Sequence, residues 1–298
     1  TYRPTPEMLR DVECLVYDIQ NYGVRYETYA STLLHCLRAA AEARLPFVVL
    51  DRPNPLNGVA VQGNMLEPGW ESFVGAFRSP VRHGLTVGEH AGMMNAELAL
   101  GLDLTVIPMR GWRRAMWYDQ TGSPWMPLSP NMPTLTTLIL YPGTCLLEGT
   151  NLSEGRGTTI PFEVVGAPWL RAEALLRRLR AANLPGVGFR STAFVPVFSK
   201  HAGHVCQGVQ MHILDRDRLD APALGVHLLA ALREIHPVEF AWRPPGKESD
   251  HYPVDLLAGG SRLREELDGS LEADQIVVSW NPDLRSFQNA RKAYLLYE

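Results

Sequence analysis

The N-terminal part of the chain alternates short apolar runs with a longer amphipathic segment, and this alternation limits its possible folds more than any other feature. Residues 15–18 (Leu-Val-Tyr-Asp) and 47–51 (Phe-Val-Val-Leu-Asp) have the apolar character of buried parallel strands. Between them, residues 26–44 place Tyr29 and Leu33 four positions apart on one face of a helix. Two such strands joined by a helix form a right-handed crossover unit. Repetition of the unit predicts an α/β sheet covered by helices on both faces.

The next helix has a clear start signal. Thr86 and Glu89 form a capping box, in which each side chain accepts a hydrogen bond from the other's backbone N–H, and the helix is predicted to run to about residue 100. The same apolar periodicity predicts the remaining elements of this half: a strand over 104–109, a short helix from Pro133 to 141 and a fourth strand over 144–148.

The order of elements changes after about residue 165. The patterns there predict a helix over 170–183, a half-buried strand around 209–213, and helices over 224–235 and 284–297. We therefore predict an α/β fold in two domains. A Rossmann-like open-sheet domain covers residues 1–164 and a smaller α+β domain covers residues 165–298.

Composition excludes several classes of protein. The chain has 298 residues, of which 46% are hydrophobic and 20% charged, as in an ordinary globular protein. Its net charge of -4 offers no basic surface for nucleic acid, and no apolar run reaches the roughly 18 residues that a transmembrane helix needs. The four cysteines have no CxxC spacing and no HExxH motif occurs, so we predict no metal site. Residues 149–159 lack the Gly-Lys-Ser/Thr ending of a phosphate loop, so we predict no cofactor.

Acidic residues end three of the predicted strands. Asp18, Asp51 and Glu148 stand at these positions, and ligands of open α/β sheets bind beyond the carboxyl ends of the strands. We therefore expect the three carboxylates to converge on one edge of the sheet. Glycoside hydrolysis uses a carboxylic acid to protonate the leaving oxygen, usually with a second carboxylate as nucleophile, base or orienting group. The alternative is that strand-end aspartates only cap turns and helices.

Polar side chains fill the loops that follow these positions. Gln20, Asn21 and Arg25 follow the first predicted strand, Arg52 and Asn54 the second. The loop over 149–159 adds a further set of polar residues: Asn151, Glu154, Arg156 and Thr158. Such a loop suits a carboxylated, hydroxylated ligand, since an arginine can bind a carboxylate through two parallel hydrogen bonds. A surface loop held by ion pairs is the alternative.

Several longer motifs are spread along nearly the whole chain. They are residues 17–25 (Tyr-Asp-Ile-Gln-Asn-Tyr-Gly-Val-Arg), 50–55 (Leu-Asp-Arg-Pro-Asn-Pro), 82–89 (Arg-His-Gly-Leu-Thr-Val-Gly-Glu), 129–134 (Ser-Pro-Asn-Met-Pro-Thr), 148–159 (Glu-Gly-Thr-Asn-Leu-Ser-Glu-Gly-Arg-Gly-Thr-Thr), 198–200 (Phe-Ser-Lys) and 208–212 (Gly-Val-Gln-Met-His). In these motifs the chain resembles the NamZ-type exo-β-N-acetylmuramidases, a family of bacterial glycoside hydrolases.

The resemblance implies removal of a terminal N-acetylmuramic acid from the non-reducing end of peptidoglycan fragments. The lactyl carboxylate of that sugar suits Arg156 or Arg25. Its 2-acetamido oxygen can attack the anomeric carbon when a carboxylate orients the group, as in known substrate-assisted glycosidases. From the loops and the resemblance together we take Asp18, Glu148 and Glu154 as catalytic candidates. The substrate-binding candidates are Arg25, Asp51, Arg52, Asn54, Asn131, Asn151, Arg156 and Thr158.

The resemblance also implies a cellular location for the chain and an alternative to the hydrolase function. Relatives carry an N-terminal segment with a Glu-bearing motif, and we expect the α/β domain of this chain to lack its first units. The alternative function is therefore a catalytically weak or inactive relative that binds muropeptide saccharides. Because peptidoglycan lies outside the cytoplasmic membrane, we expect a periplasmic or secreted location, although recycling of imported fragments would be cytoplasmic. The pattern leaves the oligomeric state open.

Overall fold

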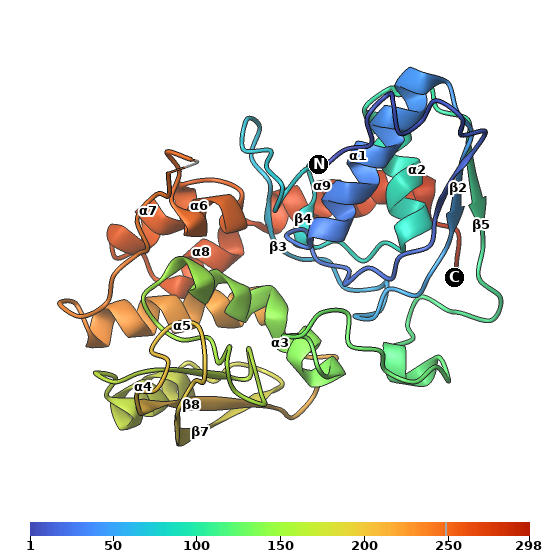
Figure 1. The fold of residues 1–298 in the computed structure, drawn as a ribbon. Helices are drawn as coiled ribbons and strands as arrows, with labels where there is room; N and C mark the ends of the chain where they lie inside the picture. The colour runs from blue at the N-terminus through green and yellow to red at the C-terminus, as the bar shows by residue number, and fades with distance from the viewer. Residues whose placement is uncertain (248) are drawn as a thin grey trace. The chain divides into compact units, whose positions relative to one another are not determined.

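The computed structural model describes residues 1–247 and 249–298, which form two compact units (Figure 1). Unit 1 consists of Thr1–Val61, Met65–Leu128 and Asp283–Glu298, and unit 2 of Gln62–Asn64 and Ser129–Pro282. The sequence pattern predicts one boundary after residue 164, whereas the main division of the structure falls at Leu128. The last residues of the chain also return to unit 1 instead of ending in the second domain.

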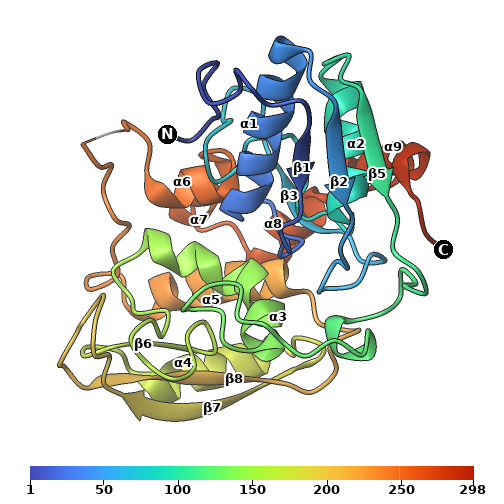
Figure 2. The ribbon, with the colours of Figure 1, turned by 45° about the vertical axis from the view of Figure 1, so that its right-hand side comes forward.

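Unit 1 contains a parallel three-stranded sheet. Its strands are β1 (Leu15–Tyr17), β2 (Phe47–Leu50) and β5 (Leu104–Ile107), in the order β1-β2-β5, and they lie side by side in Figure 2. Leu15 pairs with Phe47, and Phe47 with Leu104. The three predicted strands and the α/β class of this part of the chain are thus confirmed.

Two helices pack on the sheet and form the core of unit 1. They are α1 (Thr28–Ala43) and α2 (Val87–Glu97). Side chains from both helices share one hydrophobic cluster with every second residue of the strands; its members include Tyr17, Leu33, Leu37, Phe47, Val49, Ala91 and Met94. The predicted capping box at the start of α2 is confirmed, since Thr86 and Glu89 each accept a hydrogen bond from the other's backbone N–H.

The opposite face of the sheet is open in the part of the chain that the structure describes. Val16 is 60% exposed and Ile107 48% exposed, and both point away from the helix-covered face. The prediction of helices on both faces is therefore wrong for these residues. The strand order explains why, because right-handed crossovers that advance in one direction place their helices on the same face.

The C-terminal tail completes unit 1. It contains α9 (Asn281–Ala290) and the 3-10 helix η3 (Arg291–Tyr294), close to the helix predicted over 284–297. Phe287 enters the core, and the buried Arg291 guanidinium donates hydrogen bonds to the carbonyl oxygens of Gly58, His83 and Gly84. These contacts explain why the tail belongs to unit 1. The chain before residue 129 also contains three short elements: β3 (Gln62–Met65), whose first three residues belong to unit 2, and β4 (Pro80–Arg82) and η1 (Tyr118–Gln120) of unit 1.

Unit 2 begins with a buried helical segment that is longer than the sequence predicts. Helix α3 (Leu135–Thr144) confirms the short helix predicted from Pro133 to 141, but it continues directly into the 3-10 helix η2 (Cys145–Gly149), so the fourth strand predicted over 144–148 is wrong. Almost every residue from 137 to 149 is buried. A short apolar run of this kind cannot be assigned to strand or helix by periodicity alone, because a helix buried on all sides shows no polar face.

The rest of unit 2 combines an antiparallel sheet with helices. The sheet has the order β6-β8-β7, and its strands are β6 (Val164–Ala167), β7 (Val187–Phe194) and β8 (Cys206–Ile213). The helices are α4 (Ala172–Ala181), α5 (Ala221–Ile235), α6 (Pro253–Ala258), α7 (Arg262–Asp268) and α8 (Ala273–Ser279). The predicted helices over 170–183 and 224–235 and the strand over 209–213 are confirmed. No helix among the described residues is both long and apolar enough to cross a bilayer.

Helices α3 and α5 lie side by side in both views (Figures 1 and 2). They approach closely because glycines face each other at the contact. A Cβ atom on Gly143 would lie 1.9 Å from the carbonyl oxygen of Ala221, and one on Gly225 would lie 2.5 Å from the carbonyl oxygen of Gly143. This close packing fixes the end of α3, from which η2 and the loop after it extend.

Candidate functional site

The predicted site residues fall into two sets, one in each unit. Unit 1 holds Asp18, Arg25, Asp51, Arg52 and Asn54; unit 2 holds Asn131, Glu148, Asn151, Glu154, Arg156 and Thr158. The prediction that Glu148 ends a strand of the parallel sheet is wrong, because η2 carries it. The expected convergence of three carboxylates on one sheet edge therefore reduces to Asp18 and Asp51.

The Asp51 carboxylate accepts hydrogen bonds from several segments of unit 1. One carboxylate oxygen accepts hydrogen bonds from the backbone N–H groups of Arg52 and Gly88, and the other from the hydroxyls of Thr86 and Tyr297. Burial raises the pKa of Asp51, and these hydrogen bonds partly oppose the shift. With all four acceptor positions in use, Asp51 joins the end of β2 to the start of α2 and to the C-terminal tail.

The other predicted residues of unit 1 differ in accessibility. Arg25 is buried and its guanidinium donates a hydrogen bond to the carbonyl oxygen of Ser79 at 2.9 Å. Asn54 is also buried, with its side chain bonded to backbone groups. Asp18 and Arg52 form an ion pair of 2.6 Å at the surface. Only this pair, among the five, presents charged groups to solvent.

The strongest concentration of charge in unit 2 is a cluster that we call the Glu148 cluster: Glu148, Glu154, Arg156 and Lys200. The Arg156 guanidinium lies between the two carboxylates, with 2.8 Å from Nη2 to Glu148 Oε1 and 3.3 Å from Nε to Glu154 Oε1. Lys200 Nζ lies 2.8 Å from the other oxygen of Glu154. Two positive and two negative charges thus compensate each other within the cluster.

The two carboxylates of the cluster have different environments. The Glu154 side chain is 2% exposed, and a cation contacts each of its oxygens. The Glu148 side chain is 29% exposed, and its Oε2 accepts no hydrogen bond from any residue that the structure describes. Glu148 is therefore the carboxylate of the cluster that can contact a ligand, whereas Glu154 can act on a ligand only through its neighbours.

Lys200 holds the loop between the two carboxylates. Its ammonium group donates hydrogen bonds to the carbonyl oxygens of Leu147 at 2.9 Å and Thr150 at 3.1 Å, in addition to its contact with Glu154. The ammonium group thus bonds the backbone on both sides of Glu148 and also pairs with the buried charge of Glu154. Burial lowers the pKa of Lys200, and the charge of Glu154 opposes the shift.

Arg156 has a second support besides the carboxylates. Its guanidinium carbon lies 5.0 Å from the centre of the Phe162 ring, and the Tyr141 and Phe162 rings pack edge to face with their centres 4.9 Å apart. Although burial alone would lower the pKa of Arg156, the charges of Glu148 and Glu154 raise it. The cation is therefore both permanent and fixed in position.

Two other predicted residues of this loop have structural roles. The Asn151 side chain bonds to the backbone of Glu239 and Ala241, and the Thr158 hydroxyl donates to the carbonyl oxygen of Gly155 at 2.6 Å. Asn131 is half-buried in the segment before α3. Asn151 thus attaches the loop to the segment 239–241, and Thr158 closes a turn within the loop.

Lys200 is the residue of the cluster that the loop pattern does not indicate. It lies in the connection between β7 and β8, and the 198–200 motif of the resemblance is its only signal in the sequence. The neighbouring histidines do not build a metal site; His201 contacts the carbonyl oxygen of Asn151. Within residues 1–247 and 249–298, no group of three or more His, Cys, Asp or Glu residues could hold a metal ion.

Comparisons with known proteins cover both units. The family model described as exo-β-N-acetylmuramidase NamZ, N-terminal, matches residues 1–136, and the corresponding C-terminal model matches residues 139–297. The peptidoglycan β-N-acetylmuramidase NamZ of Bacillus subtilis (strain 168) is 42% identical over 297 residues, which span 100% of this chain and 70% of that protein. The resemblance inferred from the motifs is confirmed.

Two solved structures support the same relationship. Both are DUF1343 family proteins from Bacteroides fragilis NCTC 9343. The first has a TM-score of 0.92 at 37% identity, and the second a TM-score of 0.80 at 31% identity. In each comparison 99% of this chain and 78% of the other chain are covered.

Proposed function

Because the chain belongs to the exo-β-N-acetylmuramidase NamZ family, we propose that it is a glycoside hydrolase that releases terminal N-acetylmuramic acid from the non-reducing ends of peptidoglycan fragments. We place the site at the Glu148 cluster, because the half-exposed Glu148 carboxylate lies there beside the fixed Arg156 guanidinium. N-acetylmuramic acid offers a matching pair of groups, a 2-acetamido group and a lactyl carboxylate.

Glu148 is the residue that we propose to contact the reacting part of the sugar. Its Oε1 is held by Arg156 and its Oε2 is open to a ligand. An ion-paired carboxylate suits a group that accepts a hydrogen bond or stabilises positive charge. Here it would accept the acetamido N–H and orient the acetamido oxygen toward the anomeric carbon, as in substrate-assisted glycosidases.

Arg156 is the proposed partner of the lactyl carboxylate. It is partly exposed and is held by two carboxylates and an aromatic ring, so its orientation is fixed before a ligand binds. Arg25, the other arginine considered for this role, is buried and bonded to a backbone carbonyl. Arg156 therefore fits the role better. Glu154 and Lys200 would be positioning residues, since Glu154 is enclosed by two cations and Lys200 bonds to the loop from the connection between β7 and β8.

A specific observation also favours the second candidate function, a muropeptide-binding relative with little or no turnover. Glycoside hydrolysis needs a proton for the leaving oxygen. The exposed carboxylate of the cluster is paired with an arginine, and the second is enclosed by two cations. Neither environment is typical of a proton donor, whose carboxyl is kept neutral by an apolar pocket.

Hydrolysis of a chromogenic N-acetylmuramic acid glycoside tests the two candidates. We expect Glu148→Gln to lower kcat/KM at least about a hundredfold, the range of a lost acid, base or orienting group. Glu173→Gln, an exposed change in the first turn of α4, is the matched control and should leave the rate unchanged. Equal rates for the unmodified chain and Glu148→Gln would reject the site. Calorimetric binding of N-acetylmuramic acid without turnover would favour the binding relative.

We also propose a cellular location for the protein. A substrate derived from peptidoglycan favours a periplasmic or secreted location. Fractionation of the producing cells, with immunodetection of the chain in the cytoplasmic and extracytoplasmic fractions, tests it. Detection only in the cytoplasm would favour recycling of imported fragments.

A further inference from the structure

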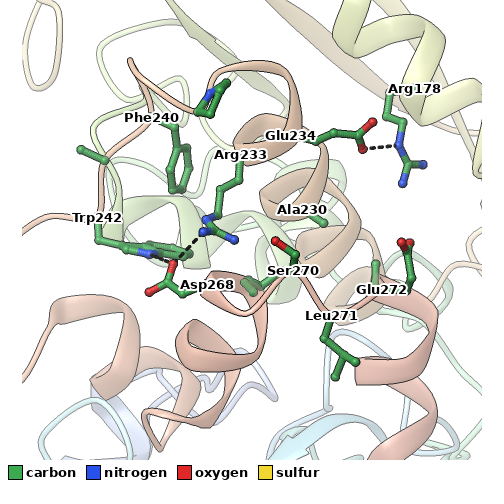
Figure 3. Close-up of a pocket in the computed structure, with 14 residues that line it drawn as sticks. Arg178, Ala230, Arg233, Glu234, Phe240, Trp242, Asp268, Ser270, Leu271 and Glu272 are labelled. Atoms are coloured by element: carbon green, nitrogen blue, oxygen red, sulfur yellow. Dashed lines mark hydrogen bonds and ion pairs between the residues drawn. The ribbon is translucent and has the colours of Figure 1, made fainter.

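Unit 2 has a cavity whose lining residues are all distinct from the Glu148 cluster (Figure 3). It lies between the C-terminal half of α5, the segment 237–242 and the connection from α7 to α8. Its volume of about 490 Å³ lies within the range of small-molecule binding sites, roughly 300–1,000 Å³. The cavity can thus accommodate a ligand of the size of a sugar ring.

One wall of the cavity is aromatic. The rings of Phe240 and Trp242 pack edge to face with their centres 5.0 Å apart. The indole N–H of Trp242 donates a hydrogen bond to the Asp268 carboxylate at 2.9 Å, which fixes the ring. An aromatic side chain combines a large apolar face with such a polar anchor, and the axial hydrogens of pyranose rings pack on faces of this kind.

Four of the five charged residues that line the cavity form two ion pairs, and the fifth, Glu272, adds a carboxylate. Arg233 contacts Asp268 at 2.9 Å and Arg178 contacts Glu234 at 2.8 Å, as the dashed lines in Figure 3 mark. Each cation is thus compensated by an anion, so the cavity offers hydrogen-bond donors and acceptors without an excess of positive charge. This combination favours an uncharged ligand rich in hydroxyl groups over an anion.

The aromatic wall is attached to the loop that follows Glu148. Trp242 pairs with Thr150 in an antiparallel bridge, and the backbone N–H of Arg243 donates to the carbonyl oxygen of Gly149 at 2.8 Å. The cavity and the Glu148 cluster therefore share one backbone framework. A ligand long enough to reach both would be held in a defined register.

We propose that this cavity is a second saccharide-binding site, which holds an uncharged pyranose residue of the glycan chain by stacking on Trp242 and by hydrogen bonds to the two ion pairs. The inference rests on the proposed function, because it assigns a second contact to the same polymer. The site would favour N-acetylglucosamine-type residues, which lack the lactyl carboxylate.

Calorimetric titration with tri-N-acetylchitotriose, an uncharged trisaccharide, tests the inference. Ala230 is a half-exposed residue of α5 that lines the cavity, so Ala230→Met should fill it and weaken binding at least about tenfold. Ala181→Met places the same side chain at an exposed helical position outside the cavity and should bind like the unmodified chain. Glu154→Gln should also bind normally. Arg178→Ala, on a different helix, is the second cavity variant and should weaken binding in the same direction.

Several results would overturn the inference. They are absence of saturable binding to the unmodified chain, equal binding by Ala230→Met and Arg178→Ala, or displacement of the trisaccharide by acetate, which would indicate an anion site. The outcome is separable from the proposed function. Hydrolysis of a chromogenic monosaccharide glycoside needs only the Glu148 cluster, and Ala230→Met should leave it unchanged.

Discussion

Replacement of Lys200 by methionine should destabilise unit 2 through the loop that carries both carboxylates of the Glu148 cluster. The change keeps the length of the aliphatic stem and removes the ammonium group. The carbonyl oxygens of Leu147 and Thr150 then lose their donor, at 2.9 and 3.1 Å, and the Glu154 carboxylate loses an ion-pair partner at 2.8 Å.

The magnitude follows from the burial of these groups. The side chains of Lys200 and Glu154 are 21% and 2% exposed. Loss of one partner of a buried ion pair costs about 3–5 kcal/mol, because the other charge stays buried without compensation. Arg156 still lies 3.3 Å from Glu154, so part of the compensation remains. We therefore expect the free energy of unfolding to fall by about 2–3 kcal/mol.

Urea unfolding, followed by tryptophan fluorescence, measures the effect. The double variant Lys200→Met with Glu154→Gln removes both charges and should recover at least about half of the loss, which gives a coupling energy above about 1 kcal/mol. A loss below about 0.5 kcal/mol for Lys200→Met, or strictly additive effects in the double variant, would refute the reasoning. Such values are typical of a solvent-exposed pair.

Three further predictions concern stability. Burial lowers the pKa of His90 from 6.5 to about 4, so the contribution of the neutral imidazole to the free energy of unfolding is fully present above pH 6.5. This contribution should fall by about 3 kcal/mol as the pH is lowered toward 4. In urea unfolding at different pH values, His90→Phe should lack this part of the decline. Burial raises the pKa of Glu27 from 4.5 to about 8, although backbone hydrogen bonds oppose the shift. The contribution of the protonated carboxyl to the free energy of unfolding is therefore fully present below pH 4.5 and is lost as the pH rises to 8. Over that pH range, Glu27→Gln should gain stability relative to the unmodified chain in the same urea measurements. Gly157 has a φ of +82°, and a Cβ atom there would lie 2.5 Å from the carbonyl oxygen of Phe198. Gly203 has a similar φ of +76°, but a Cβ atom there would meet open space. Gly157→Ala should therefore lower the midpoint of thermal unfolding clearly more than Gly203→Ala.

The elements of the first half of the chain were predictable because their local signals agree with their tertiary surroundings. The apolar runs at 15–18 and 47–51 are strands within one residue of their predicted ends, and the Thr86 capping box begins α2. One face of each strand is buried by α1 and α2, so the pattern of apolar residues directly reflects the contact.

The prediction failed where burial is complete on all sides. The helix predicted from Pro133 to 141 is present as α3, but its continuation into η2 was predicted as a strand, because this buried run has no polar face to reveal its period and Pro142 argues locally against a helix. Tertiary packing overrides this preference, since the helix lies against α5 through Gly143. The misassigned strand then placed Glu148 at the wrong sheet edge.

The Glu148 cluster was only partly predictable for a different reason. Glu148, Glu154 and Arg156 lie within nine consecutive residues, so their proximity is visible in the sequence. The ion-pair partner and the two acceptors of Lys200 lie 46, 50 and 53 positions before it, and no local pattern relates residues at such separations. Only the fold of the β7–β8 connection brings the ammonium group to the loop.

Two carboxylates predicted on the same ground, Asp51 and Glu148, show what separates a structural from a ligand-binding acid. Asp51 accepts four hydrogen bonds, from α2, the C-terminal tail and its own loop, so a ligand could bind it only by displacing a bond that unit 1 needs. Glu148 uses one oxygen for Arg156, and its other oxygen has no donor among the described residues. A carboxylate oxygen that meets solvent beside a fixed cation can accept a ligand's N–H or O–H at little cost to the fold. The number of acceptor positions left open, and not the place at the end of a strand, therefore identifies Glu148 as the acid to test first.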